Sequence, residues 1–154
     1  MTIRKANLDD IELLIELRLD FLADENGPMP PEEEKELKQK LTAYFTKWLT
    51  NGGFTAFLAE ENGQAVSTAF LWIAERPPRD AFSSNLVGTV YNVYTYAGFR
   101  RKGIAAKVMS ALLEEARVKG AACVNLLATE DGKPLYEKLG FEVEKYTAMR
   151  KKPI

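Results

Sequence analysis

One stretch carries most of the information in this sequence: Arg100-Arg101-Lys102-Gly103-Ile104-Ala105. It follows residues 88–96, which are rich in Val, Tyr and Thr and predict a strand, and it precedes a helical pattern over residues 103–119. A strand that turns into a helix through a glycine leaves the first helical N–H groups unpaired, and these groups attract anions. Gly103 and Ala105 would let a phosphate approach the backbone, so the stretch predicts a pyrophosphate site.

The same residues also fit a plainer interpretation, in which a helix start carries basic side chains for solubility. Other phosphate-binding motifs are absent from the sequence. There is no G-x-x-x-x-G-K-[ST] segment, and no G-x-G-x-x-G segment follows a strand pattern. We therefore do not expect a P-loop kinase or a dinucleotide-dependent dehydrogenase.

The patterns on either side of this stretch predict a single domain over residues 1–154 with a mixed sheet. Helices follow some strands, whereas a hairpin signal at Asn62-Gly63 joins others directly. Strands are predicted over residues 2–6, 54–59, 64–74, 88–96, 121–128 and 141–149, and helices over residues 8–23, 31–49, 103–119 and 133–139.

The amino-acid composition excludes several classes of function. The chain has no histidine, which excludes Ser-His-Asp and Cys-His catalysis and the commonest zinc ligand, so we expect no metal. The net charge of -1 favours neither nucleic acid nor an anionic membrane. No apolar run is long enough to span a bilayer and no signal-peptide core follows Met1, so a cytoplasmic protein is expected. The single Cys123 lies in an apolar run and is expected in the core.

Three motifs together resemble the GNAT superfamily of N-acetyltransferases. Arg100-x-x-Gly103-x-Ala105 is similar to its pyrophosphate signature, Val90–Thr95 is similar to its central strand, and Leu135–Phe141 (LYEKLGF) is similar to its helix-to-strand ending. The resemblance covers essentially the whole chain. It implies an α/β fold with a mixed central sheet of about six to seven strands and flanking helices.

The resemblance also implies a donor site for acetyl-CoA. In such proteins the fourth and fifth strands separate, and the pantetheine arm lies in the opening. Backbone groups of Val93, Tyr94 and Thr95 are then expected to contact pantetheine. The pyrophosphate is expected against Arg100, Arg101, Lys102, Gly103, Ile104, Ala105 and Ala106. Tyr136 falls where many members place a tyrosine beside the CoA sulfur, as a general acid, although it could simply pack the short helix.

Two positions depart from the family pattern. Thr129 stands in the cofactor-binding loop where many members have an asparagine, and Asn92 stands where many have an acidic residue that draws a proton from the amine. Asn92 cannot act as a base. Glu130, a water chain held by backbone carbonyls, or a substrate that arrives neutral are the remaining explanations.

The acceptor is much less defined than the donor. The resemblance implies an acceptor site on the first two helices and the facing loops, although surface charge or core packing explains each candidate residue better than a binding role does. The candidates are Arg18, Asp20, Phe21, Asp24, Trp72, Glu75, Tyr91, Tyr94 and Tyr96. The function expected is acetyl-CoA-dependent acetylation of a primary amine. The alternatives are a non-catalytic acyl-CoA-binding module and a phosphate-ligand binder unrelated to CoA. A small amine, an amino acid, an aminoglycoside and a peptide N-terminus all remain open as acceptors, and a homodimer stays open.

Overall fold

The computed structural model describes residues 1–153, which form a mixed α/β fold around a five-stranded sheet. The strands lie in the order β1-β2-β3-β4-β5; the first four are antiparallel to their neighbours, and β5 runs parallel to β4. The strands are β1 (Thr2–Lys5), β2 (Phe54–Glu61), β3 (Gln64–Glu75), β4 (Leu86–Thr95) and β5 (Cys123–Asn125). The helices are η1 (Leu8–Asp10), α1 (Ile11–Asn26), α2 (Pro31–Trp48), η2 (Ala97–Phe99), α3 (Ile104–Val118) and α4 (Lys133–Lys138).

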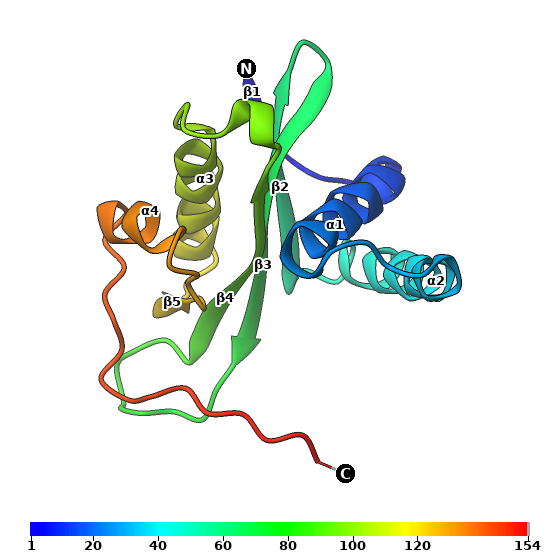
Figure 1. Ribbon diagram of the computed structural model, residues 1–154. Helices are drawn as coiled ribbons and strands as arrows, with labels where there is room; N and C mark the ends of the chain where they lie inside the picture. The colour runs from blue at the N-terminus through cyan, green and yellow to red at the C-terminus, as the bar shows by residue number, and fades with distance from the viewer. Residues whose placement is uncertain (154) are drawn as a thin grey trace.

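Helices cover both faces of the sheet. In Figure 1, α1 and α2 lie on one side of the strands, and α3 and α4 lie on the other. Each face has its own apolar core. Leu14, Leu17 and Phe45 fill the core beneath α1 and α2, whereas Val108 and Leu112 of α3 fill the core on the opposite face. The alternation of side chains along β2, β3 and β4 supplies both cores from the same strands.

The apolar spacing of α3 explains its position. Ile104, Val108, Met109 and Leu112 recur at helical spacing and are all buried, so one stripe of the helix packs on the sheet. This packing fixes the direction of the helix. Its N-terminal end is held next to the end of β4, where the basic loop lies.

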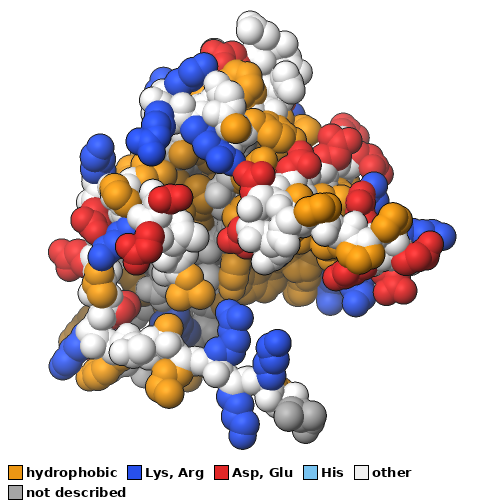
Figure 2. Space-filling model, in the orientation of Figure 1, with side chains coloured by type: hydrophobic (Ala, Val, Ile, Leu, Met, Phe, Trp, Pro, Cys, Tyr) orange, Lys and Arg blue, Asp and Glu red, His pale blue; other side chains and the backbone are white. Residues whose placement is uncertain are grey.

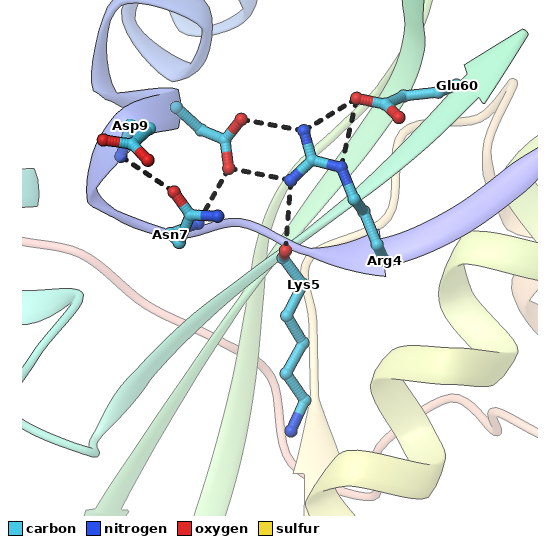
Figure 3. Close-up of polar contacts among 6 residues, drawn as sticks. Arg4, Lys5, Asn7, Asp9 and Glu60 are labelled. Atoms are coloured by element: carbon cyan, nitrogen blue, oxygen red, sulfur yellow. Dashed lines mark hydrogen bonds and ion pairs between the residues drawn. The ribbon is translucent and has the colours of Figure 1, made fainter.

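An arginine network ties the beginning of the chain to the sheet. Figure 3 shows the Arg4 guanidinium between Glu60 of β2 and the turn at Asn7. Arg4 donates two hydrogen bonds of 2.8 Å to the Asp10 carboxylate, and Asp10 accepts a third from the Asn7 N–H, also at 2.8 Å. These bonds hold the start of α1 against β1 and β2. The Arg4 hydrogen bonds also lower the pKa of Asp10.

The C-terminal part of the chain differs from the prediction. The strand predicted over residues 121–128 shortens to Cys123–Asn125, and residues 141–153 contain no helix or strand. The sheet therefore has five strands where about six to seven were expected. Alternation after Phe141 favours a strand, but a strand also needs a partner edge. Val143, Tyr146 and Met149 are exposed, and in Figure 1 this segment runs away from the sheet.

The core position predicted for Cys123 is wrong, because this residue is exposed. β5 pairs with β4 on one side, and no other strand of the described residues covers its second edge. Leu127, at the end of the same apolar run, is 77% exposed for the same reason. The composition of this run predicts a buried strand. Burial also requires a neighbouring strand beside β5, which composition does not reveal.

No helix within residues 1–153 is both long enough and apolar enough to cross a bilayer.

Candidate functional site

The basic loop has the backbone geometry of an anion site. Arg101 and Gly103 both have positive φ angles, 60° and 75°, and Gly103 is the N-cap of α3 without any side-chain cap. Lys107 is the first residue of α3 whose N–H finds a backbone carbonyl among the described residues, that of Gly103 at 3.2 Å. The N–H groups of Ile104, Ala105 and Ala106 therefore precede the helical ladder at its positive end.

Space above this loop is open. A side chain at Gly103 would begin in a region with no atom within 4 Å of its Cβ. Arg101 and Lys102 are exposed, and Figure 2 shows basic side chains gathered over η2 and the N-terminal end of α3. The loop thus combines free N–H groups, a helix dipole and positive charge around an open space, which suits a pyrophosphate.

β4 and β5 separate soon after they pair. The pairing runs from Val87 with Cys123 to Thr89 with Asn125 and then stops. The rest of β4, residues 90–95, has no strand partner on this side within the described part of the chain. This opening agrees with the separation of strands that the sequence resemblance implied.

The backbone of β4 alternates between its partner strand and the opening. Tyr96 donates its N–H to Val66 of β3 at 3.1 Å, and the Tyr94 carbonyl accepts from the Ser67 hydroxyl of β3 at 2.9 Å. Alternation then directs the N–H and C=O groups of Val93 and Thr95 into the opening. Of the three residues expected to contact pantetheine through the backbone, Val93 offers both groups, whereas the Thr95 carbonyl accepts from Arg100 Nε and the Tyr94 carbonyl bonds to β3.

A β-bulge lies in the middle of β4. Thr68 pairs with Tyr94 but Phe70 pairs with Tyr91, so Asn92 and Val93 together face one residue of β3. Asn92 has a φ of 54°, in the left-handed region that asparagine tolerates better than most residues. Bulges often redirect side chains next to active sites. Here the bulge turns the Asn92 side chain toward α1.

Arg18 of α1 contacts the bulge. Its Nη1 donates to Asn92 Oδ1 at 3.0 Å, and its guanidinium lies 5.4 Å from the centre of the Phe21 ring. Burial lowers the pKa of Arg18, although an arginine stays protonated. The sequence offered Arg18 as an acceptor candidate or a surface charge, and the structure places it half-buried beside Asn92.

Two further contacts join α1 to the end of β4. Asp20 accepts a hydrogen bond of 2.5 Å from the Tyr96 hydroxyl, and burial together with this bond raises the pKa of Tyr96. Asp24 pairs with Arg100 at 2.5 Å, and Arg100 Nε also donates to the Thr95 carbonyl at 2.7 Å. The Arg100 side chain, expected at the pyrophosphate, therefore bridges β4 and α1.

Tyr136 lies on α4 with its ring against Gly132 and Phe141. The ring centres of Tyr136 and Phe141 are 5.9 Å apart, and a Cβ at Gly132 would approach Tyr136 Cε2 to 3.0 Å. The ring is half-buried, its hydroxyl has no hydrogen-bond partner among the described residues, and burial raises its pKa. Thr129 caps the same turn, because its hydroxyl accepts from the Gly132 N–H at 3.1 Å.

The remaining candidates are divided between packing and surface positions. Trp72 packs against Trp48 with ring centres 4.8 Å apart, as its packing interpretation predicted. Glu75 is exposed at the end of β3, and Glu130 is exposed in the loop before α4. Tyr94 is buried, with its ring edge against Phe21. Within residues 1–153 no three side chains of the ligand-forming types cluster closely enough for a metal ion.

A sequence model of the acetyltransferase (GNAT) family matches residues 18–141. The chain belongs to the GNAT acetyltransferase family. The matched region contains the Arg100–Ala106 loop, the β4 bulge and Tyr136, so the family assignment rests on the same elements as the geometry. No match was found among curated protein sequences.

Solved structures of this GNAT fold resemble the chain over nearly its whole length. A predicted acetyltransferase with acetyl-CoA from Clostridium acetobutylicum is 31% identical with a TM-score of 0.82, covering 97% of this chain and 95% of that one. A GCN5-related N-acetyltransferase from Ralstonia eutropha is 24% identical (TM-score 0.80, 99% and 97% covered). Glucosamine-6-phosphate N-acetyltransferase from Arabidopsis thaliana is 22% identical (TM-score 0.69, 97% and 97% covered). The last two show the fold alone.

Sequence reasoning missed the partners of three α1 residues. Asp20 and Asp24 are four residues apart and so share a face of the helix, but nothing local indicated that Arg18, Asp20 and Asp24 meet Asn92, Tyr96 and Arg100. The bulge had a weak signal, an asparagine within an otherwise β-rich run.

Proposed function

We propose that this GNAT protein transfers an acetyl group from acetyl-CoA to a primary amine. The observation that carries the proposal is that two features occur together. The N-terminus of α3 at Gly103 has no side-chain cap, and β4 beyond Thr89 has an open edge. The helix end suits the pyrophosphate, and the open backbone of Val93 suits the amides of pantetheine. The Clostridium acetobutylicum relative with acetyl-CoA supports the same donor for this chain.

The chemistry requires direct attack on the thioester. The amine nitrogen forms a bond to the acetyl carbon, the C–S bond breaks, and the sulfur leaves with the electron pair as a thiolate. A free N–H at the β4 bulge stabilises the negative oxygen of the tetrahedral intermediate. The nitrogen gives up a proton to solvent, and the thiolate takes one up. No covalent enzyme intermediate is needed, which suits a chain without histidine.

Tyr136 is the residue we propose beside the thiolate. Its hydroxyl is free of other hydrogen bonds among the described residues, and burial raises its pKa above the ordinary 10.0. An ordinary thiol has a pKa of about 8.5, so full proton transfer from this phenol is uphill by at least about 2 kcal/mol. Tyr136 therefore acts chiefly by donating a hydrogen bond to the departing sulfur, and solvent completes the protonation.

No carboxylate at the bulge takes the proton of the amine. Asn92 occupies the central position on β4 and cannot accept a proton. The acceptor must then react in its neutral form, and the rate should rise with pH until the amine has lost its proton. A rate that stays constant across the titration of the amine would contradict this mechanism.

Release of free thiol from acetyl-CoA tests the proposal directly. The protein is incubated with acetyl-CoA and a panel of primary amines, and thiol appearance is compared with an amine-free control. We expect acetyl-CoA to raise the melting temperature and at least one amine to accelerate thiol release. Stabilisation by acetyl-CoA without turnover would favour the acyl-CoA-binding module instead. Stabilisation by other phosphates but not by CoA would overturn the donor site.

A further inference from the structure

The Arg18 side chain has no anionic partner among the described residues. Three other arginines in the structure form ion pairs: Arg4 with Asp10 and Glu60, Arg100 with Asp24, and Arg117 with Glu114. No carboxylate oxygen of residues 1–153 lies within 4.0 Å of Arg18, although this side chain is half-buried. A half-buried cation without a counter-charge is costly, which suggests that something else completes the pair.

Asn92, the neighbour of Arg18, also lacks an acceptor. It is 4% exposed, and its Nδ2 is the buried side-chain polar atom that finds no hydrogen-bond partner in the described part of the chain. Its Oδ1 is already used by Arg18 Nη1 at 3.0 Å. The guanidinium has five N–H donors, of which this bond uses one. Two adjacent side chains therefore have N–H donors that no acceptor satisfies, so the site lacks hydrogen-bond acceptors.

Aromatic side chains border these donors. Phe21 lies under the guanidinium, while Tyr44 of α2 and Tyr91 of β4 lie close enough for their charges to influence one another. Burial, and then Tyr91, raise the pKa of Tyr44, whereas Arg18 lowers it. Tyr44 and Tyr91 are 38% and 53% exposed, so the group is reachable from solvent. Glu25, whose charge also reaches Arg18, is exposed and makes no ion pair with it.

We propose that the acetyl acceptor is a small amine that also carries a carboxylate, and that Arg18 binds this carboxylate. The proposal rests on the function proposed above and names its substrate class. A carboxylate supplies the missing acceptors and matches the planar fork of a guanidinium. A phosphate, with nearly twice the charge, would call for a second cation. Arg100, the other arginine that contacts α1, is already paired with Asp24.

The position of Arg18 limits the size of the acceptor. Arg18 contacts Asn92 at the bulge, directly beside Val93, whose backbone faces the opening between β4 and β5. The thioester lies at this opening if the donor site is as proposed. The carboxylate and the attacking amine must therefore be close together in one molecule, as they are in α- and β-amino acids.

Matched acceptors test the proposal. The twenty L-amino acids and β-alanine are compared with their carboxamides, which keep the amine and lose the negative charge. The value of kcat/KM for each pair is measured in the parent protein, in Arg18→Gln and in Arg79→Gln. Arg79 lies in the exposed loop before β4 and serves as the control arginine. The ratio of carboxylate to carboxamide is compared between variants, so that the different basicities of the two amines cancel.

We expect the parent ratio for the best amino acid to fall about 10- to 100-fold in Arg18→Gln and to stay within about twofold in Arg79→Gln. Asn92→Asp supplies a second test that leaves Arg18 in place. The new carboxylate would pair with the guanidinium, so the ratio should fall again while acetyl-CoA affinity changes little. Aspartate also tolerates the left-handed backbone of this position.

A measurement of amino-acid binding distinguishes a failure of this proposal from a failure of the proposed function. The same amino acids are titrated into the protein with CoA bound, and binding is measured by calorimetry. Binding that depends on Arg18, without turnover, would sustain the carboxylate site and defeat the acetyltransferase assignment. Turnover of other amines with no binding or turnover of any amino acid would overturn the carboxylate site alone. Equal losses for carboxylates and carboxamides in Arg18→Gln would also overturn it.

Discussion

The loop from Arg101 to Ala106 takes its groups from consecutive residues, whereas the contacts of α1 with β4 and the residues just after it join positions that are 74 and 76 residues apart. The loop uses mainly backbone N–H groups, a glycine with positive φ and a helix dipole. The α1–β4 contacts use side chains, Arg18 with Asn92, Asp20 with Tyr96 and Asp24 with Arg100. The first region is a local device that many sequences can encode in the same way, and the second depends on how one helix is placed on the sheet.

This difference has a functional counterpart. A pyrophosphate is the same in every acyl-CoA, so a backbone site suits all members of a family. Acceptors differ in shape and charge, so their sites need side chains from several elements. The expected effects of mutation follow the same division, and the four below are ordered from the largest to the smallest.

Gly103→Glu should abolish measurable acetyl-CoA binding. The new carboxylate would extend into the open space above the loop and repel the pyrophosphate. Gly120→Glu is a matched control, because Gly120 has a similar φ of 80°, equally open surroundings, and lies at the other end of α3. Calorimetry and thermal melting measure affinity and folding. Normal acetyl-CoA affinity in Gly103→Glu would remove the loop from the donor site.

Tyr136→Phe should slow turnover by about 10- to 100-fold while acetyl-CoA still binds normally, because the variant loses a hydrogen bond to the charged sulfur. The change removes the hydroxyl and keeps the ring that packs on Gly132 and Phe141. Tyr146→Phe, at a position 77% exposed in the C-terminal segment, is the control. Steady-state kinetics measure the contribution of the hydroxyl to catalysis, and a melting curve measures the contribution of the ring to packing. Full activity in Tyr136→Phe would make Tyr136 a packing residue.

Asp10→Asn should lower the free energy of unfolding by about 2 kcal/mol at neutral pH, because Arg4 loses a doubly bonded partner. Arg4 holds the pKa of Asp10 below the ordinary value of 3.8, so the stabilisation is present above that pH and disappears as pH falls through the lowered pKa. Denaturant unfolding at neutral and acidic pH measures this.

Asp9→Asn is the control for Asp10→Asn. Asp9 is exposed and its carboxylate has no hydrogen bond among the described contacts, so the change should stay within about 0.5 kcal/mol. A pH-independent difference between Asp10→Asn and the parent would show that the Arg4 ion pair is not the cause. Since Asp10 is the N-cap of α1, this pair of variants also measures how much the Arg4 contact contributes to holding that helix.

Lys102→Ala should weaken acetyl-CoA binding by about threefold to tenfold, and the loss should shrink at high salt. Arg100→Ala should weaken it less, because the Arg100 guanidinium is held by Asp24 and the Thr95 carbonyl. Titration of acetyl-CoA at two salt concentrations measures both variants. A larger loss for Arg100 than for Lys102 would mean that Arg100 leaves Asp24 and turns to the phosphate.

Local patterns predicted most of the fold well. The stripe from Ile104 to Leu112 predicted α3 and its buried face, and the Asn62-Gly63 signal predicted the hairpin between β2 and β3. Patterns that need a distant partner failed. Residues 121–128 and 141–149 have strand-like composition, yet three residues of the first segment and none of the second form a strand. Composition indicates how well a segment suits a strand, but the strand forms only where the edge of a neighbouring strand is within reach.

The sequence by itself determined the loop that we propose as the donor site, since Arg101, Lys102 and Gly103 are adjacent and the helix that follows supplies the dipole. It also determined the absence of histidine chemistry. Only the tertiary structure decided that Arg18 meets Asn92 and that Arg100 bridges to α1. The physical reason is sequence distance: a loop and the first turn of a helix fold from neighbouring dihedral angles, whereas a contact across 74 residues exists only once two cores have packed on opposite faces of one sheet.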